Sequence, residues 1–268
     1  MAEAPAFYSV LIAEEADLRP ADIARALAAA RQVPFQDMMH SARRCWGIVE
    51  ERLGKAEAAA AAAALSGAGL RAAAIPGSLV SELPEAEPVL RMQFSSDGLF
   101  PETRAGGGRV PWTRLALIAA AGFRQAEAPK PAAGEALEPA KKLLKLGFTL
   151  ATGLPTSLGL GKPPLAPTAP GAELILFLDL VLRDPERRLR IEGARFDFSG
   201  LKKRMLYDVL GNCRQLTADL AAAAPAARRN RGARVFIESR PLREMGYDAL
   251  SDLERECRWL RTLEALRP

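Results

Sequence analysis

The chain has 268 residues, 49% of them hydrophobic and 6% aromatic, so it can bury one large core or two smaller ones. Its net charge of +5 permits weak attraction to nucleic acid or anionic lipid, but on so long a chain requires neither. There is no run of roughly 18 to 20 apolar residues that would span a bilayer, and no signal peptide is evident, so we expect a cytoplasmic protein.

The first 80 residues predict a small domain with the element order β-α-α-β-α-β. Runs of apolar or of alternating apolar and polar residues favour strands. Apolar residues at helical spacing and an alanine run favour helices, and proline or glycine separates the elements. We expect strands over residues 7–12, 46–53 and 70–75, and helices over residues 20–30, 35–42 and 55–65.

This region resembles the C-terminal domain of the bacterial ribosomal stalk protein. The resemblance rests on three stretches, FYSVLI, IARALAAARQVPFQDMMHSAR and GIVEERLGKAEAAAAAAALSGAGLRAAAIP. It implies the same fold for residues 7–76. It does not imply the stalk's function, because Gln32-Val33-Pro34 replaces the glycine-leucine turn and only Arg25 corresponds to the basic factor-binding helix.

A second domain is predicted after the linker at residues 81–88. Residues 90–123 read as a strand, a Ser95-Ser96-Asp97-Gly98 turn, a returning strand, a glycine-rich turn and a further apolar strand. This meander resembles the opening of a bacterial pleckstrin-homology-like domain. The resemblance implies a mostly antiparallel β-barrel or sheet closed by an amphipathic helix, and the fold class is therefore α+β.

Residues 173–198 predict the central hairpin of this second domain. The first strand is almost wholly apolar, Asp184-Pro185 supplies a turn, and the apolar set changes face at Gly193, where we expect a bulge. One amphipathic helix is then predicted from Leu201 to Leu220, on a stripe that includes Met205 and Val209. A basic loop at residues 225–234, a strand at residues 235–237 and a last helix capped by Ser251 with Glu254 complete the chain.

Residues 126–171 are predicted to be a disordered insertion rich in Pro, Ala and Gly, so the second domain comprises residues 88–125 and 172–268. Within the insertion, residues 141–150 are basic and amphipathic. They are either a linker segment that folds back on the chain or a membrane- or partner-binding helix. The residues concerned are Lys141, Lys142, Leu143, Leu144, Lys145 and Phe148.

No residue pattern announces catalysis, a cofactor or a metal ion. The three widely spaced cysteines are typical of buried thiols. The single histidine, His40, has no carboxylate or thiol placed to act with it as a general base. The hairpin carboxylates read as parts of solvated faces; they are Asp179, Asp184, Glu192 and Asp197. We therefore expect a protein that is not an enzyme.

Basic groups are the most suggestive feature. If they converge, they form an anion- or partner-binding surface; otherwise they decorate an arginine-rich exterior. They are Lys202, Lys203, Arg204, Arg228, Arg229, Arg231 and Arg234. We expect a binding or adaptor protein with a protein partner. Association with RNA or the ribosome through the basic loops, and with membranes through residues 141–150, are the alternatives.

Overall fold

The computed structural model describes residues 7–104, 106–125 and 173–267. Within these residues, those up to Phe123 and those from Ile175 on form one compact unit. The predicted insertion at residues 126–171, with its basic segment at residues 141–150, lies outside the described residues. No described helix is both long and apolar enough to cross a bilayer.

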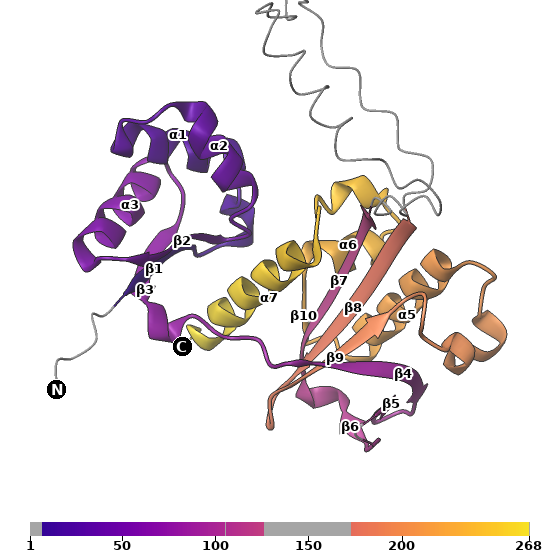
Figure 1. The fold of residues 1–268 in the computed structure, drawn as a ribbon. Helices are drawn as coiled ribbons and strands as arrows, with labels where there is room; N and C mark the ends of the chain where they lie inside the picture. Colours follow the sequence, from indigo (N-terminus) through magenta and orange to yellow (C-terminus); the bar gives the residue numbers. More distant parts are fainter. Residues whose placement is uncertain (1–6, 105, 126–172, 268) are drawn as a thin grey trace, which may run out of the picture. The chain divides into compact units, whose positions relative to one another are not determined.

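A three-stranded antiparallel sheet with the order β2-β1-β3 organises residues 7–76, and Figure 1 shows the helices α1, α2 and α3 on one side of it. The elements follow the predicted order, β-α-α-β-α-β. Buried residues of α1 and α3, such as Ile23, Leu27 and Leu65, supply its core. The elements are β1 (Tyr8–Ile12), the 3-10 helix η1 (Glu15–Asp17), α1 (Pro20–Arg31), α2 (Phe35–Arg43), β2 (Ile48–Leu53), α3 (Lys55–Gly67) and β3 (Ala72–Pro76).

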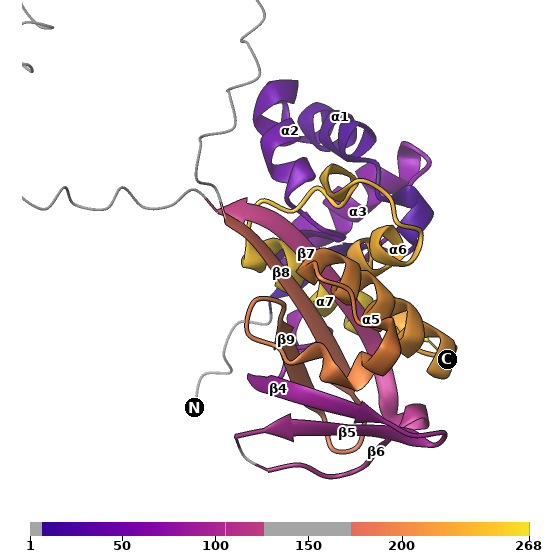
Figure 2. The ribbon, with the colours of Figure 1, turned by 90° about the vertical axis from the view of Figure 1, so that its right-hand side faces the viewer.

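A seven-stranded sheet with the order β10-β7-β8-β9-β4-β5-β6 forms the rest of the core, and Figure 2 shows its strands from β7 to β6. Two of its pairings, β10 with β7 and β4 with β9, are parallel. The described strands do not close into a barrel, so the sheet is open and mixed. Its strands are β4 (Ala86–Phe94), β5 (Gly98–Thr103), β6 (Val110–Pro111), β7 (Leu115–Gln125), β8 (Glu173–Leu182), β9 (Arg187–Glu192) and β10 (Arg228–Arg229).

The predicted hairpin is present as β8 and β9, with Leu180 opposite Leu189. Its second strand ends at Glu192, earlier than predicted. Residues after Gly193 form a turn instead of a bulged strand, and Phe196 and Phe198 stack edge to face at 4.9 Å.

Three predictions after the hairpin are wrong. The expected single helix from Leu201 to Leu220 is split into the 3-10 helix η4 (Phe198–Arg204) and α5 (Val209–Ala223), because Asp208 caps a new helix by accepting from Gly211 N at 2.6 Å. Residues 235–237 belong to the helix α6 (Arg231–Ile237). The last helix, α7 (Leu250–Ala265), is capped by Asp252, which accepts from Ala249 N at 3.1 Å, and not by Ser251.

The core contains a buried ion cluster that the solvated-face interpretation of Asp179 missed. Asp179 is fully buried and accepts hydrogen bonds from Arg188 and Arg190, each at 2.8 Å. Glu254 of α7 reaches the same two arginines, at 2.9 and 3.0 Å. This cluster ties the hairpin to the last helix.

The three cysteines are free and buried, as predicted. The helix α7 also contacts the small N-terminal sheet, since the buried Trp259 donates from its indole Nε1 to Ile12 O at 2.7 Å. The side chain of Trp259 lies so close to Gly47 that a Cβ there would be 2.0 Å from the ring. This contact brings η1 near the C-terminal part of the chain.

Candidate binding sites

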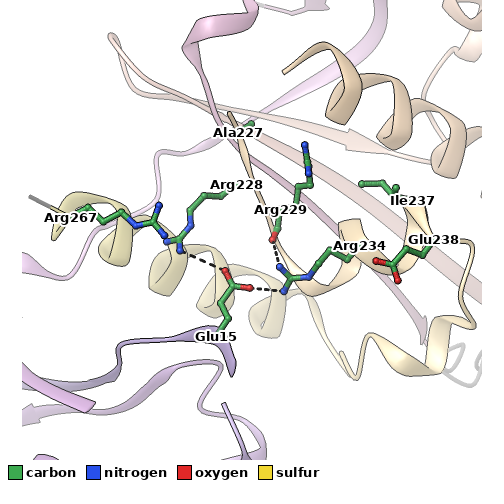
Figure 3. Close-up of a pocket in the computed structure, with 8 residues that line it drawn as sticks. All are labelled: Glu15, Ala227, Arg228, Arg229, Arg234, Ile237, Glu238 and Arg267. Atoms are coloured by element: carbon green, nitrogen blue, oxygen red, sulfur yellow. Dashed lines mark hydrogen bonds and ion pairs between the residues drawn. The ribbon is translucent and has the colours of Figure 1, made fainter. Parts of the chain in front are cut away.

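An open pocket of about 380 Å³ lies beside β10 and α6 (Figure 3). We call it the arginine pocket. Four arginines and two glutamates leave its lining with a formal net charge of +2. Its charged residues lie on η1, β10 and α6 and directly after α6 and α7. They are Glu15, Arg228, Arg229, Arg234, Glu238 and Arg267.

Glu15 bridges two of these arginines (Figure 3). One carboxylate oxygen lies 2.7 Å from Arg234 Nη2, and the other lies 3.7 Å from Arg228 Nη2. The Glu15 side chain remains 30% exposed, so solvent reaches the carboxylate. The two guanidinium groups thus already hold an anionic group in the lining of the pocket.

The fold places these arginines through the buried residue Asn230. Its side chain accepts from Ala120 N at 2.9 Å and donates to Ala120 O at 3.0 Å, which attaches it to the strand β7. The same Oδ1 accepts from Ala233 N at 2.7 Å and so begins α6. Arg228 before Asn230 and Arg234 after it therefore have fixed positions.

Burial lowers the pKa of Arg228, and the positive charge of Arg267 lowers it further. Figure 3 shows the two guanidinium groups beside each other. Arg228 keeps its charge, because arginine does not lose its proton in proteins. The lowered value indicates a place where positive charge is crowded and partly dehydrated.

The structure brings together three of the predicted basic residues, Arg228, Arg229 and Arg234, but not in a loop. They lie on β10 and α6, which corrects the predicted basic loop at residues 225–234. The Arg229 guanidinium points away from Glu15 and donates to Ala221 O at 3.1 Å. Arg231 lies 5.4 Å from the ring centre of Trp46 and does not line the pocket.

Lys202, Lys203 and Arg204 belong to a different surface, which we call the 202–209 segment. The sequence predicted that they begin a long helix, but they lie at the end of the 3-10 helix η4. The next residues expose large apolar side chains: Met205 is 53% exposed, Leu206 is 49%, Tyr207 is fully exposed and Val209 is 40%. The prediction that Met205 and Val209 lie on a buried stripe is therefore wrong.

Hydrogen bonds fix the 202–209 segment at the backbone of Leu206 and at the side chain of Arg204. Asn212 accepts from Leu206 N at 2.7 Å and donates to Leu206 O at 2.9 Å. Arg204 pairs with Asp219 through two hydrogen bonds of 2.8 and 2.7 Å, and this pairing raises the pKa of Arg204. The segment is thus a fixed turn that exposes apolar side chains.

The backbone of Lys202 has a positive φ of 54° with ψ of −126°. For a residue other than glycine this conformation costs about 1 to 3 kcal/mol. We expect Lys202→Gly to raise the free energy of unfolding by about 1 kcal/mol, as measured by urea denaturation. Lys203→Gly is the control, since Lys203 has no positive φ, and it should be neutral or destabilising. An equal change in the free energy of unfolding for both variants would show that the backbone of Lys202 is not strained.

No signal in the sequence joins Glu15 or Arg267 to the basic residues near position 230, because they meet only through the tertiary fold. Among residues 7–104, 106–125 and 173–267, no group of three or more His, Cys, Asp or Glu side chains is placed to hold a metal ion. Comparisons with protein-family models, curated proteins and solved structures found no match to this chain.

Proposed function

We propose that this chain is a non-enzymatic binding or adaptor protein that docks a protein partner through the 202–209 segment. One observation carries the proposal. Ten large hydrophobic side chains are exposed in the part of the chain that the structure describes, and four of them fall between positions 205 and 209. The other six are dispersed along the sequence, as is ordinary for a protein surface.

Exposed apolar side chains on a fixed turn favour association. The hydrogen bonds of Asn212 fix the backbone of Leu206, and those of Arg204 fix the residue before Met205. A partner that covers Met205, Leu206 and Tyr207 therefore gains apolar burial with little loss of backbone entropy. Tyrosine and methionine are also enriched at the cores of protein interfaces.

The charges around the turn favour a protein partner over a lipid surface. Lys202 and Lys203 are exposed on one side of the apolar residues, and Asp208 follows them directly on the other. A bilayer that took up Tyr207 would bring the Asp208 carboxylate against anionic headgroups. An apolar groove bordered by acidic residues matches the lysines and can avoid Asp208, so we infer this chemistry for the partner.

We expect Leu206→Ser and Tyr207→Ser each to weaken partner binding about 30-fold, since central interface residues contribute about 2 kcal/mol or more. The free energy of unfolding should change by less than about 0.5 kcal/mol, because both side chains are exposed. A photo-crosslinker at position 207 identifies the partner in native lysate, and calorimetry measures its affinity.

The matched controls are Leu79→Ser and Phe100→Ser, which remove exposed apolar side chains of 49% and 42% exposure elsewhere. They should leave the affinity unchanged, and the complex should survive nuclease and moderate salt. The proposal fails if serine at positions 206 and 207 abolishes only binding to phosphatidylserine vesicles, or only self-association. It also fails if the crosslinked partner binds both variants normally.

A further inference from the structure

We infer that the arginine pocket binds a small molecule through a phosphate group held by Arg228, Arg234 and Arg267. We further infer that Glu15 competes with this group for the same guanidinium donors. This site is separate from the 202–209 segment, so the inference does not depend on the proposed docking function.

Two of the guanidinium groups are held in place by backbone carbonyls before any ligand contacts them. Arg228 Nη1 donates to Leu260 O at 3.0 Å, and Arg234 Nη1 donates to Arg229 O at 3.1 Å. Each guanidinium has five N–H donors, so both keep donors for an anion. Because some of their donors already make hydrogen bonds that fix these side chains, the guanidinium groups bind phosphate with little further loss of side-chain entropy.

The pocket has more positive charge than its own glutamates neutralise. Glu238 pairs at 2.8 Å with Arg240, which does not line the pocket. Glu15 is then the lining carboxylate that pairs with Arg228 and Arg234. Its carboxylate makes one short contact, with Arg234, while its distance of 3.7 Å from Arg228 is too long for a hydrogen bond.

A phosphate group fits this arrangement better than a carboxylate does. It carries a charge of about −1.5 to −2 at neutral pH and offers three acceptor oxygens, so it can contact three guanidinium groups at once. Placed between Arg228 and Arg267, it would also relieve their mutual repulsion. The Glu15 carboxylate has two oxygens and bridges only Arg228 and Arg234.

The form of the site favours a small ligand over a nucleic acid. The pocket volume of about 380 Å³ lies within the range of about 300 to 1,000 Å³ that is usual for small-molecule sites. Single-stranded nucleic acid is bound along extended basic grooves with aromatic platforms. No aromatic residue lines the arginine pocket within the described part of the chain.

Two variants of the full chain should act in opposite directions on phosphate affinity. Glu15→Gln removes the competing charge and should tighten binding of inorganic phosphate and of a nucleoside monophosphate about tenfold. Arg267→Gln removes one charged contact and should weaken both about tenfold. Calorimetry at constant ionic strength in chloride measures each affinity. Equal affinity for the two probes indicates free phosphate as the ligand, and tighter binding of the nucleotide indicates an organic phosphate.

Arg195→Gln is the matched control, because Arg195 is 79% exposed and does not line the pocket. It changes the net charge by the same amount as Arg267→Gln and should leave the affinity unchanged. Arg267 is exposed beyond α7, so its replacement should not unfold the protein. The inference is overturned if Glu15→Gln and Arg267→Gln leave phosphate affinity unchanged. Binding of a single-stranded oligoribonucleotide but of neither small probe would also overturn it.

Discussion

The Asp179→Ala variant is expected to lose about 3 to 5 kcal/mol of unfolding free energy, because it leaves two arginines without their buried partner. Asp179 is fully buried, and Arg188 and Arg190 are only 5% and 15% exposed. Both guanidinium groups hydrogen-bond to the same carboxylate. Urea denaturation of the full chain, at constant pH and salt, measures the loss.

Glu254→Ala is the matched control for Asp179→Ala. Glu254 contacts the same two arginines, but it is 38% exposed, and its loss should cost no more than about 1 kcal/mol. Water can replace the Glu254 carboxylate and cannot reach the site of Asp179. A similar cost for both variants would show that the buried carboxylate contributes no more than an exposed one.

The hairpin of β8 and β9 could be predicted from the sequence because its signals are local. A continuous apolar run, an Asp-Pro turn and an alternating run specify two paired strands without information from elsewhere. The same holds for the elements of residues 7–76. The burial of Asp179 could not be predicted in this way, because it depends on α7, which packs over the hairpin more than 60 residues later in the chain.

The segments after the hairpin show how local patterns mislead. A 3.6-residue period runs through residues 201–220, but the positive φ of Lys202 and the Asp208 cap interrupt the helix, so Met205 faces water. The β-branched and aromatic residues at 235–237 favour a strand, yet the Asn230 cap begins a helix there.

The candidate sites were only partly predictable for the same reason. Charge density in the sequence correctly drew attention to Arg228 and Arg234. Their counter-charge, Glu15, and their neighbour, Arg267, lie far apart in the sequence, and tertiary contacts such as that between α7 and the small sheet bring them close. Tertiary packing, and not a local motif, makes the arginine pocket.

The Gly232→Ala variant should lose at least about 3 kcal/mol of stability, although alanine is the better helix former. Gly232 lies in the first turn of α6, where a Cβ would be 1.8 Å from Ala120 O and 2.7 Å from Ala120 C. Ala120 lies within the sheet strand β7 and cannot move aside, so α6 must shift. The shift would break the Asn230 hydrogen bonds that position Arg228 and Arg234, so binding of inorganic phosphate should weaken as well.

Gly67→Ala provides a control with the opposite sign. Gly67 ends α3, and a Cβ there meets no atom within 4 Å, so alanine should raise the free energy of unfolding by up to about 1 kcal/mol. Because both substitutions add one methyl group to a helix, only the close approach of α6 to β7 explains a loss at one position and a gain at the other. A higher free energy of unfolding for Gly232→Ala as well would mean that α6 does not pack this closely on the sheet. The argument that Arg228 and Arg234 have fixed positions, on which the inferred phosphate site depends, would then fail too.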